Sequence, residues 1–275
     1  MSSPPGTMVC GVDHSPGART AADIAIDLAA RLAARLVLVH AVPLPRPSRE
    51  VGVTQPTSLV TIERMREVGA SLLEEIAAHA EDGSEIAREV RIGAAAEVLG
   101  TVAHDAGAEC VVVGSRGLGR VGAVLHGSVS LSFAAHGPCP TLIVPEVASP
   151  IGDGPVVCAV DDTDGARAAL LKAADLATRL DRQLLLVTVK AVDDPTSAAA
   201  ERPVDDTGLG ISPEWVYLRG EPAGAILEAA AARRAAVIVI GSRGRGALAA
   251  SVLGSVSSAV AGGSRSPVMV VRAAA

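Results

Sequence analysis

Short apolar runs alternate along this chain with longer segments in which apolar residues recur every three or four positions. The short runs predict strands and the longer segments predict helices. In the first half we expect strands at 8–13, 36–42, 86–92, 110–114 and 141–145. Helices are expected at 16–35, 58–80, 95–106 and from residue 127 onward. Because the strands are apolar on both faces, the pattern predicts a parallel sheet covered by helices on both sides.

The second half of the chain repeats the first. Asp13, at the end of the first strand, matches Asp161 at a distance of 148 residues, whereas Gly114 matches Gly241 at a distance of 127. The second copy is therefore 21 residues shorter, and we expect the loss to remove most of the helix at 58–80. Its strands are expected at 156–161, 184–190, 214–219, 236–241 and 268–272. Repeats of this size are domains, which we place at 1–148 and 149–275.

Each copy carries a glycine loop directly after its fourth strand. The spacing is Gly-x-x-Gly-x9-Gly-Ser in both, over residues 114–128 and 241–255. The residues that define it are Gly114, Gly117, Gly127 and Ser128, and then Gly241, Gly244, Gly254 and Ser255. A strand that runs into such a loop and then a helix start is a common receptor for phosphate, because the first helical N–H groups lack partners and lie at the positive end of the helix dipole.

The loops and the aspartates are expected to meet in one crevice of each copy. In a doubly wound sheet of order 3-2-1-4-5, strands 1 and 4 are neighbours whose connections leave in opposite directions, and ligands bind beyond the carboxyl ends of the strands at that point. Asp13 and Asp161 lie at the carboxyl ends of the first strands, while Gly114 and Gly241 end the fourth strands. The two motifs therefore predict one binding site in each copy.

Each candidate residue also has a structural interpretation. Asp13 and Asp161 can accept hydrogen bonds from a ribose or an adenine amino group, or they can cap the helix that follows. Arg116 and Arg243, inside the loops, can pair with phosphate or lie solvated at the surface. The glycines can serve tight turns alone. The serines can donate to phosphate or act as N-caps, and these are Ser128, Ser130, Ser255 and Ser257.

The composition narrows the range of partners. The chain has 275 residues, a formal net charge of −6, and one each of Trp, Tyr and Phe. Binding of single-stranded nucleic acid usually needs a basic groove and aromatic stacking platforms, so we do not expect nucleic acid as a partner. No apolar run approaches the roughly 20 residues that span a bilayer, and the amino-terminal residues do not form a signal stretch. We therefore expect a cytoplasmic protein without membrane contact.

Few residues are arranged in the motifs that are typical of catalysis or metal binding. The four cysteines form no Cys-x-x-Cys and are expected to be buried apolar side chains. All six histidines lie in the first copy without paired spacing, so we assign no metal site. A Walker lysine and a Gly-x-Ser-x-Gly motif are both missing, so the sites are predicted to hold a nucleotide without machinery to cleave it. The abundance of Ala and Arg indicates a GC-rich, bacterial genome.

With these motifs the chain resembles the universal stress protein family in its tandem two-domain form. Gly-x-x-Gly-x9-Gly-Ser is the signature of that family's ATP-binding branch, and the first-strand pattern Val-Asp-x-Ser/Thr also occurs twice, at 12–15 and 160–163. The resemblance implies two Rossmann-like (adenine nucleotide alpha hydrolase-like) α/β domains, each with a five-stranded parallel sheet of order 3-2-1-4-5. It also implies ATP as the ligand, with Mg or Mn on the phosphates.

The resemblance assigns a set of nucleotide-binding residues to each copy, with adenine near the aspartate and the backbone of Ala41 or Val189. In the first copy these residues are Gly11, Val12, Asp13, Ser15, Ala41, Gly114, Arg116, Gly117, Gly127, Ser128, Val129 and Ser130. In the second copy they are Ala159, Val160, Asp161, Thr163, Val189, Gly241, Arg243, Gly244, Gly254, Ser255, Val256 and Ser257. The 21 residues missing from the second copy remove part of the wall beside its crevice, and Asp162 and Asp164 add negative charge there. Both differences predict weaker anion binding in the second copy.

The leading hypothesis is an ATP-binding stress-response regulator that acts through nucleotide-dependent conformation or through an unidentified protein partner. The alternatives are a weak metal-dependent ATP hydrolase and a nucleotide-independent interaction scaffold. Domains of the family often pair through the fifth strand, here 141–145 and 268–272. The two copies are therefore expected to pair with each other, which would hide both sheet edges. A homodimer is a further expectation.

Overall fold

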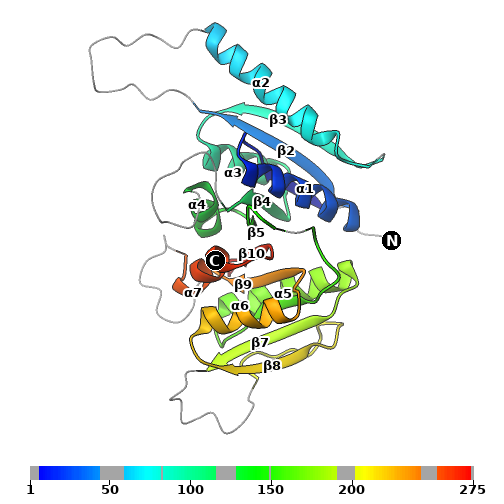
Figure 1. The fold of residues 1–275 in the computed structure, drawn as a ribbon, viewed down its shortest axis with the longest axis vertical. Coiled ribbons are helices and arrows are strands. Elements are labelled where there is room, and N and C mark those ends of the chain that lie inside the picture. Colours follow the sequence, from blue (N-terminus) through cyan, green and yellow to red (C-terminus); the bar gives the residue numbers. More distant parts are fainter. Residues whose placement is uncertain are drawn as a thin grey trace, which may run out of the picture.

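Both halves of the chain fold as five-stranded α/β units in the computed structural model, which describes residues 6–43, 59–81, 83–115, 128–148, 150–190, 202–242 and 253–273 (Figure 1). The first unit contains β1 (Thr7–Gly11), α1 (Pro16–Arg31), β2 (Arg35–Val42), α2 (Leu59–Ala77), β3 (Ile86–Ile92), α3 (Ala95–Asp105), β4 (Cys110–Gly114), α4 (Ser128–His136) and β5 (Thr141–Val144). The second unit contains β6 (Val156–Ala159), α5 (Asp164–Leu180), β7 (Leu184–Lys190), β8 (Glu214–Arg219), α6 (Pro222–Ala232), β9 (Val237–Gly241), α7 (Ser255–Gly263) and β10 (Val268–Val271).

The ten strands form one continuous sheet in the order β3-β2-β1-β4-β5-β10-β9-β6-β7-β8. The strands of each unit are parallel to one another and follow the predicted order 3-2-1-4-5. The units join where β5 and β10 run antiparallel, with Leu142 opposite Met269. The expected pairing of the two copies through their fifth strands is therefore confirmed, and it satisfies two sheet edges that would otherwise be open.

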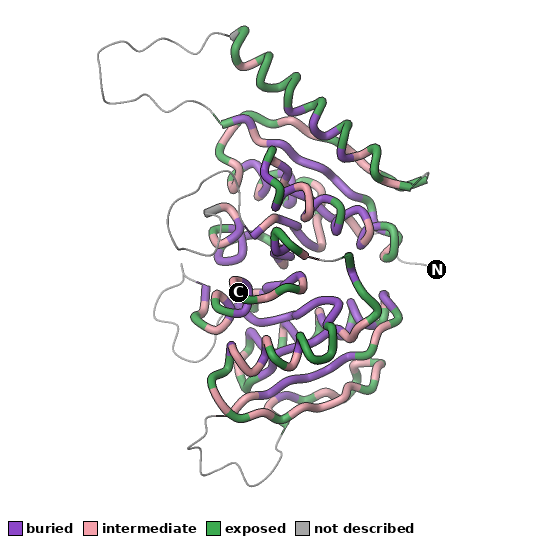
Figure 2. The backbone as a smooth tube through the Cα atoms, in the orientation of Figure 1, coloured by how far each residue is buried: buried purple, intermediate pink, exposed green. Residues whose placement is uncertain are grey.

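Each face of the sheet carries its own apolar core, and both cores run through both units. Helices α1, α2 and α5 cover one face with residues such as Leu28, Leu73 and Leu170. Helices α3, α4, α6 and α7 cover the other face, where Phe133 and Val260 are buried. The central strands are buried along most of their length, and the exposed residues gather on the outer sides of the helices (Figure 2). The expected two-sided parallel sheet is thus confirmed.

Element ends differ from the predicted bounds at a few places. Helix α1 ends at Arg31 rather than residue 35, because the chain turns at Ala33 with φ 49° and begins β2 at Arg35. The apolar sequence runs through this turn without a break, so its periodicity gives no stop signal. Strands β1 and β6 end two residues before Asp13 and Asp161, which leaves both aspartates in the loops beyond the strands.

The connection from β7 to β8 differs from its counterpart in the first unit. In the first unit α2 covers β2 and β3, whereas the described residues 202–213 of the second unit contain no helix. Val204 is buried in the core on the sheet face that α1, α2 and α5 cover, and Leu209 and Ile211 pack against that core. Trp215 donates from Nε1 to Asp206 Oδ2 at 2.8 Å, and Arg202 pairs with the same carboxylate. An irregular segment fixed by Asp206 thus supplies part of the cover that α2 supplies in the first unit.

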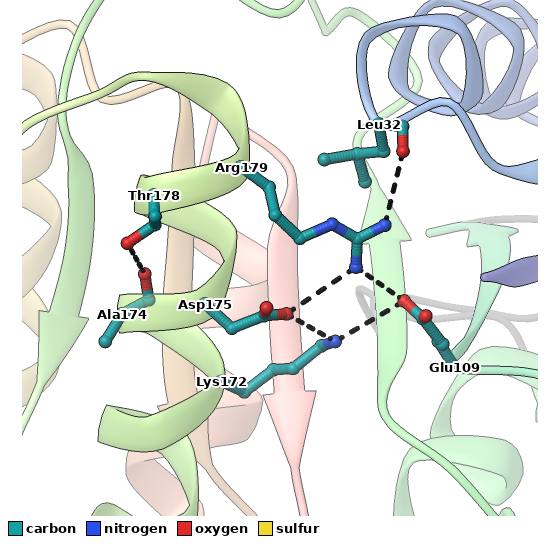
Figure 3. A network of polar contacts seen from close by, with 7 residues as sticks. All are labelled: Leu32, Glu109, Lys172, Ala174, Asp175, Thr178 and Arg179. Carbon is teal, nitrogen blue, oxygen red and sulfur yellow. Dashed lines mark hydrogen bonds and ion pairs between the residues drawn. The ribbon is translucent and has the colours of Figure 1, made fainter. Parts of the chain in front are cut away.

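A cluster of ion pairs links the two units beside the β5–β10 junction (Figure 3). Glu109, just before β4, accepts from Arg179 Nη1 of α5 at 2.7 Å and lies 3.8 Å from Lys172 Nζ. Arg179 also donates to the carbonyl oxygen of Leu32 at the end of α1, at 3.4 Å. Asp175 lies within reach of both cations. The cluster fixes α5 of the second unit against α1 and β4 of the first.

The four cysteines are free thiols, and Cys10, Cys110 and Cys158 are buried as expected for apolar core residues. Burial raises the pKa of Cys110 to about 12 and that of Cys139 to about 11, so both thiols stay protonated near neutral pH. Among the described helices, none combines the length and apolar character needed to cross a membrane.

Replacing Arg179 by Ala should lower the free energy of unfolding by about 1–3 kcal/mol, because the half-buried Glu109 carboxylate and the Leu32 carbonyl lose their partner. Urea denaturation measures this change. Arg66→Ala removes an exposed pair with Glu63 within α2 and should cost less than about 0.5 kcal/mol. Equal effects of the two variants would contradict a stabilising role for the cluster.

Candidate functional site

The loops after β1 and β6 adopt the same hydrogen-bonded turn. Asp13 Oδ1 accepts from the backbone N–H of Ser15 at 2.9 Å and from its hydroxyl at 2.5 Å. The hydroxyl oxygen of Ser15 in turn accepts from the N–H of Ala18 and so caps α1. Asp161 and Thr163 repeat this arrangement at the start of α5. Ser15 and Thr163, and not the aspartates, are therefore the N-caps, and one oxygen of each aspartate accepts hydrogen bonds from the capping residue.

The second carboxylate oxygen, Oδ2, has no hydrogen-bond partner within the described part of the chain at Asp13 or Asp161. Both aspartates are accessible to solvent, Asp13 partly and Asp161 more fully. A fixed carboxylate with one oxygen committed and one available can accept a hydrogen bond from a ligand hydroxyl or amino group. The structure thus allows each aspartate to hold the capping residue and to bind a ligand at the same time.

The last residue of the fourth strand touches the first turn of the helix after the first strand. A methyl group on Gly114 would lie 2.7 Å from the carbonyl oxygen of Gly17 in α1, and one on Gly241 would lie 2.7 Å from the carbonyl carbon of Gly165 in α5. Such distances exclude any side chain. The glycine that begins each loop therefore lies in contact with the helix that Ser15 or Thr163 caps, as the predicted convergence of the two motifs requires.

The described ends of the second glycine loop lie next to each other. The N–H of Gly254 donates to the carbonyl oxygen of Ser242 at 2.8 Å, and the hydroxyl of the buried Ser257 donates to the carbonyl oxygen of Gly241 at 2.6 Å. These bonds hold the first turn of α7 against the end of β9. Donation from Ser257 to a phosphate remains a prediction, and it requires the hydroxyl to leave Gly241.

Helix α7 begins without a side-chain cap. Gly254 occupies the N-cap position, and no side chain accepts from the first-turn amides there. Ser255, the first helical residue, is exposed, and Val256 packs against the core. By contrast, Ser15, Thr163 and Glu221 cap α1, α5 and α6. Within the described residues the first-turn amides of α7, like those of α3, therefore have no side-chain partner, which is what a phosphate receptor requires.

The equivalent region of the first unit is described only in part. Helix α4 begins at Ser128, Val129 packs against the core, and Ser130 is buried. Five predicted site residues lie outside the described residues, namely Arg116, Gly117, Gly127, Arg243 and Gly244. Gly11 and Ala159 end β1 and β6, followed by the buried Val12 and Val160. Ala41 and Val189 lie near the carboxyl ends of β2 and β7, at the same edge of the sheet.

The two sites differ in charge and in their supporting residues. Asp162 and Asp164 are exposed at the start of α5, where α1 has His14 and Pro16. The first unit also contains a buried histidine that the sequence analysis did not single out, His40, whose Nδ1 lies 2.9 Å from the carbonyl oxygen of Val12. Only its replacement by a different residue type in the second copy could have drawn attention to it. No cluster of potential metal ligands occurs among the described residues.

Gly114→Ala and Gly241→Ala should each lower the free energy of unfolding by about 1–3 kcal/mol, because the added methyl group meets helix backbone that cannot move aside. Thermal or urea denaturation of the unliganded protein tests this. Gly100→Ala is a matched control, since Gly100 lies within α3 with open space around it and should gain up to about 1 kcal/mol. Unchanged stability of both loop variants would show that the close contact is not real.

Known proteins resemble this chain in both of its units. The chain matches the model of the Universal stress protein family over residues 6–145 and 204–272. A universal stress protein of Mycolicibacterium smegmatis is 34% identical over 184 residues, an alignment that spans 60% of this chain and 62% of that protein. A universal stress protein of Mycobacterium tuberculosis strain H37Rv is 29% identical over 293 residues, covering 96% of each.

The fold is shared over nearly the full length with a solved structure. The crystal structure of a universal stress protein from Archaeoglobus fulgidus superposes with a TM-score of 0.72 at 22% identity, covering 97% of this chain and 96% of the other. Because the family match extends over both glycine-loop units and the tandem architecture agrees, this chain belongs to the universal stress protein family.

Proposed function

We propose that this chain binds ATP at the carboxyl ends of β1 and β4, and again at those of β6 and β9, and acts as a nucleotide-dependent stress-response regulator. One observation carries the proposal. The glycine that begins each glycine loop packs directly against the backbone of the helix turn beside Asp13 or Asp161, with no side chain between them. A crevice between two such backbone elements at a switch point in the sheet is where nucleotides bind in folds of this type.

The adenosine end of the ligand is assigned to the aspartate side of each crevice. The Oδ2 atom of Asp13 can accept from a ribose hydroxyl or the adenine amino group while Oδ1 maintains the turn. The backbone of Ala41, near the end of the neighbouring strand β2, is the proposed surface for adenine. Asp161 and Val189 take these roles in the second unit.

The phosphates are assigned to the glycine loops and to the helix starts that follow them. In the second unit the amides at the start of α7 and the hydroxyl of Ser255 supply donors. In the first unit the corresponding helix start is Ser128. Arg116 and Arg243 are proposed to pair with the phosphates, and a Mg or Mn ion to accompany them. The loop residues lie outside the described part of the chain, so their roles rest on the spacing of the sequence.

The two sites are proposed to bind with different affinities. Asp162 and Asp164 place two exposed carboxylates at the start of α5, close to where the anionic ligand would lie, whereas the first unit has His14 and Pro16 at these positions. Like charges in partly solvated surroundings repel over several ångströms. We therefore assign the tighter site to the first unit.

A regulatory role is favoured over catalysis because one oxygen of Asp13 and of Asp161 is engaged by the capping residue Ser15 or Thr163, and because the sequence has no Walker lysine or Gly-x-Ser-x-Gly motif. Phosphate release from ATP in the presence of Mg or Mn would favour the weak hydrolase instead. Absence of nucleotide from the purified protein, together with failure to bind added ATP, would favour the scaffold. The protein partner and any homodimer remain proposals that the sites do not specify.

Asp13→Asn should weaken ATP binding by about tenfold or more at the tighter site, because the amide nitrogen replaces the free acceptor Oδ2 while the amide oxygen keeps the bonds to Ser15. Asp161→Asn should weaken the second site alone. Titration with ATP by isothermal calorimetry measures both sites in the full chain.

Asp105→Asn is the matched control, since it makes the same change of charge on an exposed residue at the end of α3. It should leave both affinities unchanged. Equal ATP affinities for the unmodified chain, Asp13→Asn and Asp161→Asn would remove the aspartates from the site and contradict the proposed binding mode.

A further inference from the structure

His40 connects the carboxyl ends of β1 and β2 in the first unit. It lies in β2, is only 8% exposed, and places its Nδ1 atom 2.9 Å from the carbonyl oxygen of Val12. Because a carbonyl oxygen only accepts hydrogen bonds, Nδ1 must carry the proton and donate it. The N–H of Val12 in turn donates to the carbonyl oxygen of Val39 at 2.8 Å. The residue before Asp13 is therefore held by β2 through both its N–H and its C=O.

The opposite edge of the same ring packs against α2. A methyl group on Gly69 would lie 2.5 Å from Cδ2 of His40, so the helix approaches the imidazole as closely as glycine permits. His14, the residue after Asp13, contacts the ring edge to face with the centroids 5.7 Å apart. His40 thus lies between α2 and the loop that carries Asp13, and a displacement of α2 at Gly69 would act directly on the ring.

Neither side of this connection occurs in the described part of the second unit. Thr188 occupies the position of His40, and the carbonyl oxygen of Val160 has no side-chain partner in the described residues. Only the bond from the N–H of Val160 to the carbonyl oxygen of Val187 is retained, at 2.9 Å. The described residues 202–213 supply no helix to cover this position. Within the described ranges, the first unit therefore has both the histidine and the helix, and the second unit has neither.

We propose that His40 is a positioning residue that couples α2 to the nucleotide site of the first unit. The inference rests on the proposed ATP binding and adds to it a route by which α2 controls the affinity of that site alone. His40 does not touch the ligand. It fixes the peptide between Val12 and Asp13, and so the direction of the Asp13 carboxylate, from a position against which α2 packs.

Two substitutions of His40 separate the hydrogen bond from the bulk of the ring. In His40→Asn the side-chain amide nitrogen can take the place of Nδ1 and donate to the Val12 carbonyl, whereas His40→Leu fills the space without a donor. Both are made in the full chain carrying Asp161→Asn, which confines tight binding to the first unit. Gly69→Ala perturbs the ring from α2 without altering His40, and Thr188→Val is the matched change in the second unit.

We expect His40→Leu to weaken ATP binding at the first site about 2- to 10-fold, the range of one lost hydrogen bond. His40→Asn should restore most of the affinity, Gly69→Ala should weaken binding in the same direction, and Thr188→Val should leave it unchanged. Hydrogen exchange without ATP provides a second measure. The amides of residues 13–15 should exchange faster in His40→Leu and Gly69→Ala, and those of residues 161–163 should not change.

Different results would overturn the role of His40 and the proposed function. Normal ATP binding by His40→Leu with unchanged exchange at residues 13–15 would overturn the role of His40 and leave the proposed function intact. Failure of His40→Asn to restore affinity, when the variant is folded, would overturn the hydrogen bond as the means of coupling. If the unmodified chain bound no ATP, the proposed function and the coupling to it would both be wrong, even if the exchange rates responded to His40.

Discussion

The candidate sites of this molecule depend on the contact between the end of the fourth strand and the first helical turn of each unit. Gly114 meets the backbone of Gly17, and Gly241 meets that of Gly165, at distances that leave no room for a side chain. The contact requires glycine on the strand and places the start of the glycine loop beside the capped turn that holds Asp13 or Asp161. The candidate site therefore follows from backbone packing, before any ligand contact is considered.

The pairing of β5 with β10 makes one sheet and two shared cores out of two similar units. Each unit is supported by the other at an edge that would otherwise be open, and the Glu109–Arg179 pair adds a polar connection beside it. This support accompanies a different cover of the sheet in the second unit. In the first unit α2 packs on the sheet, whereas in the second unit the irregular residues 202–213, held by the Trp215–Asp206 hydrogen bond, pack on the same face.

The sequence predicted the strands, their order and the internal pairing well, because runs of Val, Leu and Ile that are apolar on both faces have few alternatives to a covered parallel sheet. It placed the end of α1 too late, since Leu32 and Ala34 continue the apolar pattern through a turn. For Gly114 it offered a role toward a ligand or in a tight turn. The structure adds a packing role that no spacing rule reveals, and the role toward a ligand stays a prediction. His40 was missed because its function depends on Val12 and Gly69, which only the fold brings together.

Each unit is proposed to bind one ATP molecule, and the two sites are proposed to differ in affinity. Equilibrium dialysis of the unmodified full chain against ATP, carried to saturation, tests both proposals most directly. Two ATP molecules should bind per chain, with two different affinities. The tighter site should be that of the unit that carries Asp13 and His40. Retention of no ATP at saturation would contradict both proposals.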